Sequence, residues 1–448
     1  MTPPVRTLVY GFATTGQAVA RALVKRGLEA VLVDDHPSTD AREAAELMGM
    51  EVLESPSRAQ LARLVEGVDA LAPSPGIPDL HPVFEAVAVA DVPVISEFDL
   101  AREWDHRPMV AITGTDGKTT VTSLVTGMLQ RSGTRALTAG NDAMPLVEAI
   151  DRDDVDVFVV EASSFRLGHT RQFEPRVATW LNFAPDHLDV HRSVEAYERA
   201  KARIWTDVAP DGSAIANADD PVVMRNRNQT RRAITFSTAI DADYCVVDGQ
   251  LRGPGGAVVI DVDELGRSMP HDVSNALAAA ATATAAGASI DAVREGLREF
   301  RGLPHRVELI GEWRGVRWFD DSKATVPHAT LAAVRGFHSV VLIAGGRNKG
   351  VDLAPLAGAR EHVRAVVAMG EAADEVEAVF GGLVPVERVH TNMDDVVTVA
   401  SDLAESGDAV LLSPGCASFD WFTSYEQRGD AFRASVERQL HHTVEVAE

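Results

Sequence analysis

The stretch Met109-Val-Ala-Ile-Thr-Gly-Thr-Asp-Gly-Lys-Thr-Thr120 decides the expected fold of the middle of the chain. Its apolar start predicts a buried strand, and apolar positions recur at helical spacing over 121–129, so a helix is expected from about Thr119. The glycine loop and the Lys-Thr pair between them are typical of a phosphate cradle, in which loop N–H groups and a lysine bind an anion and a threonine hydroxyl binds Mg²⁺. A full Walker A motif needs a glycine at position 112, which is Ile112, so this is a shortened P-loop. A strand-to-helix turn with an incidental lysine is the alternative.

The composition is that of a large globular protein with an acidic balance. With 448 residues, the chain is long enough for about three domains. The net charge of −24 argues against a nucleic-acid or anionic-membrane partner, because either would require a basic face. The two cysteines, Cys245 and Cys416, give neither a disulfide framework nor a metal-ligand spacing. These features favour a cytoplasmic protein with no nucleic-acid partner and no insertion into a membrane. We also expect small-molecule partners and a monomer.

Residues 1–107 are predicted to form a first α/β domain that begins with a strand, a helix and a second strand. The turn Gly11–Gly16 follows the first strand, and Asp34 or Asp35 ends the second near the distance expected of a dinucleotide-binding fold. Ala13 replaces the central glycine of that turn, which normally lets a pyrophosphate approach, so NAD binding is disfavoured. A nucleotide held differently and a purely structural turn both stay open.

Two further strands are expected in this domain, near residues 70–72 and 92–96. Ser74-Pro-Gly-Ile77 follows the first of them, where α/β folds place ligand loops. The polar stretch 102–108 ends in proline and is the expected domain boundary.

A central domain is predicted over residues 108–306 and a C-terminal domain over 307–448. In the central domain, an apolar strand ends at Glu161, where a Mg²⁺ ligand would lie beside the P-loop; a helix-capping or solvated acid is the alternative. His187 could be a metal ligand, a general base or a buried neutral histidine. Lys201, taken alone, would be a solvated lysine on a helix.

In the C-terminal domain, buried strands are expected to lead into polar loops that begin at Asp321, Gly345 and Ser413. Since ligands bind at the carboxyl ends of strands in such sheets, these loops predict a doubly wound sheet with its loop face turned toward a ligand.

Taken together and in this order, the loops resemble those of the Mur ligase family, the ATP-dependent amide-forming enzymes of peptidoglycan precursor synthesis. The resemblance covers essentially the whole chain and is carried by Gly114–Thr120, Gly302-Leu-Pro-His-Arg306, Asp321-Ser-Lys-Ala-Thr325, Ser413–Ser418 and Tyr425–Gly429. It implies an α/β protein of three domains. These are an N-terminal Rossmann-like domain for a UDP-linked substrate, a central P-loop ATPase-type domain with a mostly parallel sheet, and a C-terminal Rossmann-like domain that completes the amino-acid site.

The resemblance also implies an activity. An amide would form between the L-alanyl carboxylate of UDP-N-acetylmuramoyl-L-alanine and the amine of D-glutamate, through an acyl phosphate made at the expense of ATP. Within the family, addition of a different amino acid, including L-glutamate, is the alternative. Outside it, the alternative is a nucleotide-dependent oxidoreductase built on the first domain.

Carried over residue by residue, the resemblance assigns a catalytic group of Lys118, His187 and Lys201. Lys118 would contact the β- and γ-phosphates, Thr119 and Glu161 would hold one Mg²⁺, and His187 and Lys201 would hold a second. Lys201 would do so as a carbamate, whose formation needs the neutral amine of a partly buried lysine. Further ATP contacts are implied for Gly114, Thr115, Asp116, Gly117, Thr120, Asn275, Arg306 and Asp321. The implied substrate residues are Thr15, Asp34, Ser74, Gly76, Asn141 and Ser163 for the UDP-linked substrate, and Thr325, Lys349, Ser418, Phe419 and Tyr425 for the amino acid.

Four positions depart from the family's usual pattern. Ala13 replaces a glycine, Arg166 stands where glutamine is usual, Arg347 occupies a position that is often acidic, and Tyr425 replaces a phenylalanine. The two arginines bring positive charge near anionic ligands, which could alter affinity or the choice of amino acid.

Overall fold

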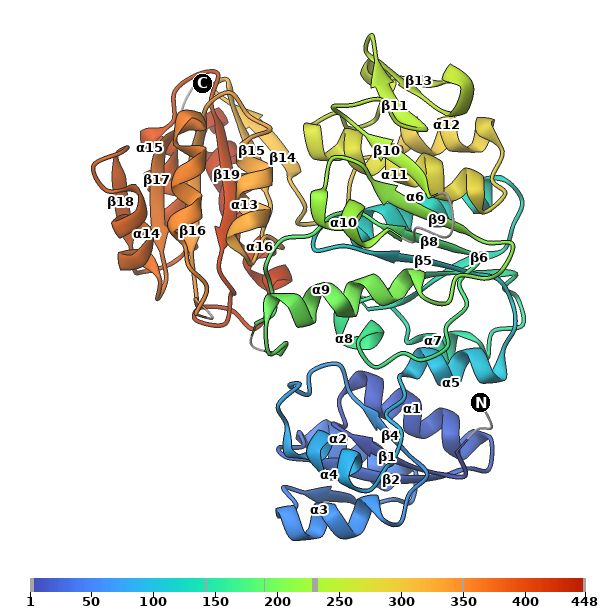
Figure 1. Cartoon of the computed structure of the whole chain (residues 1–448). Helices are drawn as coiled ribbons and strands as arrows, with labels where there is room; N and C mark the ends of the chain where they lie inside the picture. The colour runs from blue at the N-terminus through green and yellow to red at the C-terminus, as the bar shows by residue number, and fades with distance from the viewer. Residues whose placement is uncertain (1–3, 142, 189, 228–232, 349, 446–448) are drawn as a thin grey trace. The chain divides into compact units, whose positions relative to one another are not determined.

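A computed structural model describes residues 4–445 of the chain, apart from positions 142, 189, 228–232 and 349 (Figure 1). The described residues form three sheets in two compact units. The first unit comprises residues 1–268 with 272–300, and the second comprises residues 269–271 with 301–448. The α/β class with three sheets agrees with the predicted fold class. The predicted boundaries at 107/108 and 306/307 stay predictions.

The first sheet has the strand order β3-β2-β1-β4, with all neighbours parallel. Its strands are β1 (Arg6–Tyr10), β2 (Glu29–Asp34), β3 (Val52–Glu54) and β4 (Ala70–Pro73); the helices of this part are α1 (Thr14–Lys25), α2 (Thr39–Leu47), α3 (Arg58–Val65), α4 (Pro82–Val89) and α5 (Glu97–Trp104). Because β1 and β4 are parallel neighbours, the turn after Tyr10 and the loop at Ser74 lie at one edge of the sheet. The close approach requires glycine, since a Cβ at Gly16 would lie 2.0 Å from the carbonyl oxygen of Gly11. The strand expected at 92–96 is reduced to a single bridge between Leu71 and Val94.

The second sheet, in the described part of the chain, has nine strands in the order β13-β12-β11-β10-β9-β8-β5-β7-β6. It is parallel from β6 to β11 and antiparallel only at β12 and β13, as expected of a mostly parallel sheet. The strands are β5 (Met109–Thr113), β6 (Ala136–Gly140), β7 (Val157–Glu161), β8 (Val177–Trp180), β9 (Ser213–Asn217), β10 (Ile234–Ser237), β11 (Tyr244–Val247), β12 (Gln250–Arg252) and β13 (Val258–Asp261). The helices are α6 (Lys118–Arg131), α7 (Leu146–Ala149), α8 (Ser164–Leu167), α9 (Val194–Ala202), α10 (Pro221–Asn226), α11 (Pro270–Ala285) and α12 (Ile290–Glu299), with 3₁₀ turns η1 (Arg203–Trp205), η2 (Pro254–Gly256) and η3 (Val262–Glu264).

The quoted stretch forms the centre of this sheet. All residues of β5 are buried, and the strand lies between β7 and β8. Helix α6 begins at Lys118, one residue before its expected start, after Gly117 as the N-cap residue. Val121, Val125 and Met128 of α6 are fully buried in the core that this helix shares with α11 and α12.

The third sheet has the order β14-β15-β19-β16-β17-β18, with only β14 antiparallel to its neighbour. Its elements are β14 (Glu308–Trp313), β15 (Val316–Asp320), α13 (Pro327–Val334), β16 (Val340–Gly345), η4 (Ala354–His362), β17 (Val363–Met369), α14 (Ala373–Phe380), β18 (Val386–Val389), α15 (Met393–Leu403), β19 (Ala409–Gly415) and α16 (Tyr425–Glu445). One core contains residues of α13 and α14, and a second contains residues of α15 and α16. Helices therefore cover both faces, which confirms the predicted doubly wound sheet.

The described residues contain no helix with both the length and the apolar character that crossing a membrane demands.

Candidate active site

The P-loop is tied down by hydrogen bonds to the segment that follows β8. Asp116 N donates to Asn182 Oδ1 (2.9 Å), and Asn182 Nδ2 donates back to the carbonyl oxygen of Asp116 (3.2 Å). The buried hydroxyl of Thr115 contacts Ala184 O (3.1 Å) and accepts from Ala184 N (2.9 Å). Lys118 Nζ folds onto the loop and donates to Gly114 O (2.9 Å) and Thr115 O (2.8 Å). The loop therefore presents a fixed backbone and one lysine at the start of a helix, as a phosphate cradle requires.

Asn275, an expected ATP contact on α11, lies against this loop. Gly117 has φ +80°, and a Cβ there would lie 2.5 Å from Asn275 Oδ1. Only glycine combines this backbone conformation with so close an approach. The structure thus brings Asn275 to the P-loop, although the two are far apart in the sequence.

Glu161, the first expected metal ligand, is buried at the end of β7. The parallel register pairs it with Ile112, so its carboxylate lies where β5 leads into the P-loop. Its Oε1 accepts from Asn141 Nδ2 (3.2 Å). Thr119 is in the first turn of α6. A carboxylate and a hydroxyl are hard oxygen ligands, so these two residues have the chemistry that Mg²⁺ prefers.

His187 is not a buried histidine. Its side chain is 39% exposed, and Nε2 lies 3.2 Å from Asp186 Oδ2. Its φ of +55° is left-handed, and its ring meets Phe165 edge-on, 4.7 Å between centroids. A half-exposed imidazole is accessible to a ligand, which a buried one is not.

Lys201 is the residue whose environment differs most from the simple expectation. Although α9 lies near the surface, the Lys201 side chain is buried, and Nζ donates to Gly114 O at 2.7 Å. It also lies over the ring of Tyr197, 4.7 Å from its centroid. Burial lowers the pKa of the Lys201 ammonium well below its usual value, and the charge of Lys118 lowers it further. The interpretation of a solvated helix lysine is wrong, because the Lys201 side chain is buried beside the P-loop.

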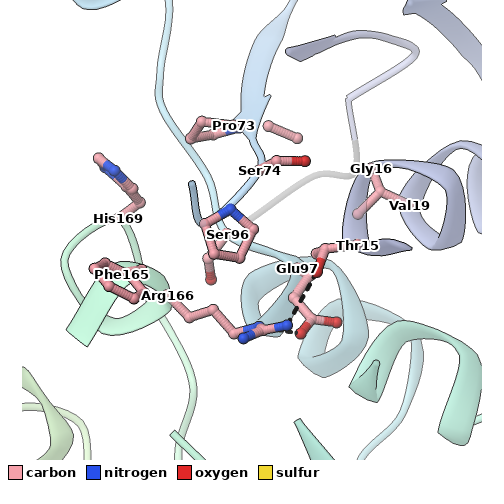
Figure 2. A pocket seen from close by; sticks show the side chains of 12 residues that line it. Thr15, Gly16, Val19, Pro73, Ser74, Ser96, Glu97, Phe165, Arg166 and His169 are labelled. Carbon is pink, nitrogen blue, oxygen red and sulfur yellow. Dashed lines mark hydrogen bonds and ion pairs between the residues drawn. The ribbon is translucent and has the colours of Figure 1, made fainter. Parts of the chain in front are cut away.

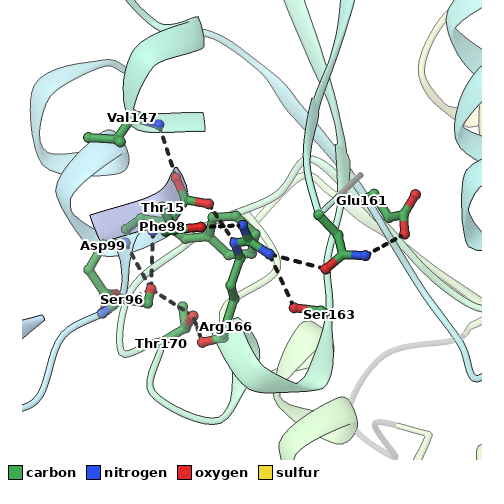
Figure 3. Close-up of polar contacts among 11 residues, drawn as sticks. Thr15, Ser96, Phe98, Asp99, Val147, Glu161, Ser163, Arg166 and Thr170 are labelled. Atoms are coloured by element: carbon green, nitrogen blue, oxygen red, sulfur yellow. Dashed lines mark hydrogen bonds and ion pairs between the residues drawn. The ribbon is translucent and has the colours of Figure 1, made fainter. Parts of the chain in front are cut away.

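Four of the six residues expected to bind the UDP-linked substrate belong to two neighbouring sets of contacts. Thr15 and Ser74 line a pocket with Glu97, Phe165, Arg166 and His169, as Figure 2 shows. Asn141 and Ser163 accept hydrogen bonds from Arg166 Nη1, at 3.2 and 3.5 Å. Figure 3 shows Ser163 beside the Arg166 guanidinium. Asp34 instead binds backbone, with Oδ2 accepting from Phe12 N (2.6 Å). Gly76 does not line this pocket.

Sequence reasoning missed Glu97 and gave Arg166 only as a departure from a pattern. Glu97 is an acid in the first turn of a helix, a position that usually indicates a solvated, dipole-stabilising side chain. Its full burial comes from long-range packing, which local sequence does not report.

In the second unit, both carboxylate oxygens of Asp321 accept hydrogen bonds from the protein itself. It is buried, its Oδ2 accepts from Ser413 Oγ (2.7 Å) and its Oδ1 accepts from Val307 N (3.2 Å). Burial raises the pKa of the Asp321 carboxyl to about 7. Arg428, which sequence reasoning missed, is fully buried and donates to Ser322 Oγ (2.9 Å) and Ser322 O (2.8 Å). These contacts join two of the loops that carry the resemblance.

The other expected amino-acid residues belong to the same loops. Tyr425 stacks on the ammonium of Lys323, with 4.0 Å from Nζ to the ring centroid. Ser418 is buried, and Phe419 is half exposed. Arg347 pairs with Glu371 (2.7 Å), so its charge is offset on the surface. Thr325 and Arg306 lie in described loops, and Lys349 lies outside the described residues.

Within the described ranges, the second unit also contains three neighbouring side chains that could hold a metal ion: His305, Glu308 and Asp320. His305 Nδ1 lies 2.7 Å from Asp320 Oδ2, and Glu308 Oε2 accepts from His305 N (3.1 Å) and from Arg433 (2.7 Å). These hydrogen bonds and the ion pair with Arg433 explain why the three side chains lie together without requiring a metal ion.

The chain is similar over nearly its whole length to proteins of known family. Residues 112–283 match the Mur ligase middle domain, and residues 305–416 match the Mur ligase glutamate ligase domain. A relative from Frankia casuarinae, named UDP-N-acetylmuramoylalanine--D-glutamate ligase, is 41% identical over 96% of this chain and 93% of its own. The chain belongs to the Mur ligase family. A relative of the same name from Exiguobacterium sibiricum is 37% identical over 97% of this chain and 96% of its own.

Solved structures of Mur-type ligases share the fold. A pseudomurein peptide ligase type C from Methanothermus fervidus has a TM-score of 0.62 at 18% identity, covering 97% of this chain and 99% of its own. MurF from Acinetobacter baumannii has a TM-score of 0.60 at 16% identity, covering 97% and 93%. At these identities the likeness concerns the fold alone, and it confirms the predicted architecture.

Mur ligases use ATP and Mg²⁺, and the residues around the P-loop suit both. The cradle has its lysine and helix N-terminus for phosphates. Glu161 and Thr119 supply oxygen ligands next to it.

Proposed function

We propose that this Mur ligase joins the L-alanyl carboxylate of UDP-N-acetylmuramoyl-L-alanine to the amine of D-glutamate, converting ATP to ADP and phosphate. The observation that carries the proposal is the near full-length similarity to relatives of that name. The site supports it independently, because a P-loop alone suits any NTPase, whereas the buried amine of Lys201, which donates to a carbonyl oxygen of that loop from α9, is an added feature. Membership of a ligase family disfavours the oxidoreductase alternative.

The proposed reaction has two steps. A carboxylate oxygen of the alanyl group attacks the γ-phosphorus of ATP, forming an acyl phosphate and releasing ADP. The amine of D-glutamate then attacks the acyl carbon, phosphate leaves and the amine loses a proton. Both steps bring anions together, so neutralisation and alignment supply most of the catalysis.

The chain's own residues have separate tasks in this scheme. Lys118 and the N-terminus of α6 bind the phosphates and stabilise the charge that develops on them. Thr119 and Glu161 would hold one Mg²⁺, and His187 and Lys201 a second; bound Mg²⁺ neutralises phosphate charge. We expect His187 to act as a ligand in preference to a sole general base.

Carbamylation of Lys201 is part of the proposal. The neutral amine nitrogen attacks carbon dioxide, a C–N bond forms, and the nitrogen releases one proton, which leaves a carbamate anion. The burial of Lys201 and its lowered pKa support this, because the ammonium form cannot attack. The carbamate would convert a cation next to Lys118 into an oxygen ligand for a cation.

A ligation assay tests the proposed function. The full chain is incubated with UDP-N-acetylmuramoyl-L-alanine, ATP and Mg²⁺, and each of a panel of D- and L-amino acids is added in turn. ADP release and the product mass should depend on D-glutamate, with L-glutamate as the matched control. Release that follows another amino acid, or none, would overturn the choice of acceptor. Light scattering and cell fractionation test the monomeric state and cytoplasmic location that belong to the same proposal.

A further inference from the structure

Arg166 and Glu97 form an ion pair inside the first unit. Arg166 Nε lies 2.6 Å from Glu97 Oε1, and the two side chains are 5% and 1% exposed. Arg166 is on α8, directly after the strand that ends at Glu161, and Glu97 opens α5. Breaking a buried pair of this kind is costly, because it leaves one charge without a partner in an apolar environment.

The guanidinium also joins predicted substrate residues to a predicted metal ligand. Arg166 Nη2 donates to Thr15 Oγ1 (3.0 Å), and Nη1 donates to Asn141 Oδ1 (3.2 Å). Asn141 Nδ2 then donates to Glu161 Oε1 (3.2 Å). Three hydrogen bonds thus connect the first turn of α1 with the end of β7.

Glu97 is itself held in place from several sides. Its Oε2 accepts from Val147 N (3.3 Å), at the start of α7. The neighbouring Ser96 and Asp99 form a capping box on α5, and Asp99 Oδ1 accepts from Arg171 N (2.8 Å) and Gln172 N (2.6 Å). The carboxylate therefore has little freedom to follow a displaced guanidinium.

This arrangement differs from that of an anion-binding arginine. The charge of Arg166 is offset by Glu97, and each of its three nitrogens donates to a protein oxygen. The pair instead has a positioning effect. Because the guanidinium of Arg166 is rigid and planar, it fixes the positions of Thr15 and Asn141 at the same time.

We propose that the buried Arg166–Glu97 pair is a positioning device that sets Thr15 and Asn141 for the UDP-linked substrate and aligns them with Glu161. The inference rests on the proposed function for the identity of that substrate. Arg166 is a positioning residue, since it acts through Thr15 and Asn141.

Three variants test this inference: Arg166→Gln, Glu97→Gln and the double variant. Each single change leaves the remaining partner without its counter-charge, so KM for UDP-N-acetylmuramoyl-L-alanine should rise about tenfold, with KM for ATP within about twofold of wild type. In the double variant two neutral amides can bond to each other, so KM should return to within about threefold of wild type. Recovery of this kind requires coupling between the two side chains.

Arg107→Gln is the matched control. Arg107 also binds a carboxylate, Asp105 (2.5 Å), and it donates to the carbonyl oxygens of Ile150 and Val155 (2.5 and 2.9 Å), but it has no contact with Thr15 or Asn141. It should lower the melting temperature and leave every KM unchanged. The inference is overturned if the Arg166 and Glu97 variants, like Arg107→Gln, lower the melting temperature and leave every KM unchanged. It is also overturned if the rise in KM of the double variant equals the two single effects combined.

Calorimetric binding of UDP-N-acetylmuramoyl-L-alanine separates this inference from the proposed function. If the wild-type protein binds that compound but forms no product, the proposed function fails, and a tenfold weaker binding by Arg166→Gln still supports the positioning role. If the wild-type protein ligates and the variants bind as tightly as it does, the positioning role fails alone. Absence of binding by the wild-type protein overturns both.

Discussion

Lys118 and Lys201 donate hydrogen bonds to the same acceptor, the carbonyl oxygen of Gly114, at 2.9 and 2.7 Å. Two ammonium groups on one oxygen would repel each other, and Lys201 is the buried member of the pair. This repulsion disappears if Lys201 is neutral or is converted to an anion. The shared acceptor therefore links the P-loop to the chemistry that we propose for Lys201.

Loss of Lys118, which we propose binds phosphate, should abolish ligation. In Lys118→Ala, kcat should fall at least about 100-fold, because the charge that meets the transferring phosphoryl group is gone. The fold should survive, since Lys118 is partly exposed and its hydrogen bonds, among the residues that the structure describes, are to its own loop. Coupled ADP release and circular dichroism measure the two effects. Lys25→Ala removes an exposed lysine paired with Asp151 and should turn over normally. Near-normal turnover of Lys118→Ala would contradict the P-loop assignment.

Glu161→Ala should impair ligation as strongly as Lys118→Ala does, and its dependence on Mg²⁺ should distinguish the two variants. Removing a carboxylate next to the P-loop should raise the Mg²⁺ concentration needed for half-maximal activity about tenfold or more. A titration of activity against Mg²⁺ measures this, with Glu148→Ala, whose carboxylate pairs with Arg21 at 2.7 Å, as the control. An unchanged Mg²⁺ dependence would remove Glu161 from the metal site.

Lys201→Ala should be inactive and partly rescued by short carboxylic acids. The substitution leaves room where the carbamate would stand, and formate or acetate can supply the missing oxygens. Rates measured at increasing acid concentration should rise and saturate, and wild-type rates should not rise. Carbon-13 NMR with labelled bicarbonate should give a carbamate signal in the wild-type protein only. The absence of both the rescue and the signal would contradict carbamylation.

The titration of Lys201 also has a consequence for stability. Its pKa is lowered in the folded state, so the unfolded chain binds the proton more readily, and the free energy of unfolding rises with pH between the lowered value and about 10.4. Lys201→Met removes this penalty. Without carbon dioxide, its melting temperature should exceed that of the wild-type protein at pH 8, and the difference should shrink as the pH approaches 10.4. A difference in melting temperature that does not change with pH would mean that folding does not lower the pKa of Lys201.

The fold was largely predictable because apolar runs and glycine loops report local structure. The strand before the P-loop, the strand that ends at Glu161 and the three C-terminal strands before Asp321, Gly345 and Ser413 all formed near the expected residues. The stretch at 92–96 failed as a strand because Pro93 has no N–H for a sheet, which leaves one bridge at Val94.

The sequence predicted which loops form the candidate site, but it did not predict which of the charged side chains are buried. Lys201 has the sequence context of an exposed lysine, and its burial arises from packing of α9 beside the P-loop, which only the folded chain shows. The same holds for Glu97 and Arg166, which lie 69 positions apart and share one ion pair. Periodicity locates elements, but it does not report which charges meet across them.

Asp321 should make stability fall as pH rises. Its folded-state pKa of about 7 exceeds the usual carboxyl value, so the folded state holds the proton more tightly, and the free energy of unfolding declines between about pH 4 and 7. Asp321→Asn keeps the shape and can still bond Ser413 and Val307. Its melting temperature relative to wild type should therefore be higher at pH 8 than at pH 5. A pH-independent difference would show that the carboxyl is not raised.

Gly117→Ala should impair nucleotide binding beyond its effect on the backbone. Any side chain at φ +80° costs about 1 kcal/mol, and here the added methyl group would also lie 2.5 Å from Asn275 Oδ1. Gly133, at the other end of α6, has φ +85° and no atom within 4 Å of an added Cβ, so Gly133→Ala carries the backbone cost without the collision. Both variants should lose a similar part of their stability from the backbone, but only Gly117→Ala should raise KM for ATP, by about tenfold. Melting curves and ATP titrations of the pair separate the two terms, and an equal KM for ATP in both would mean that Asn275 does not constrain the phosphate loop.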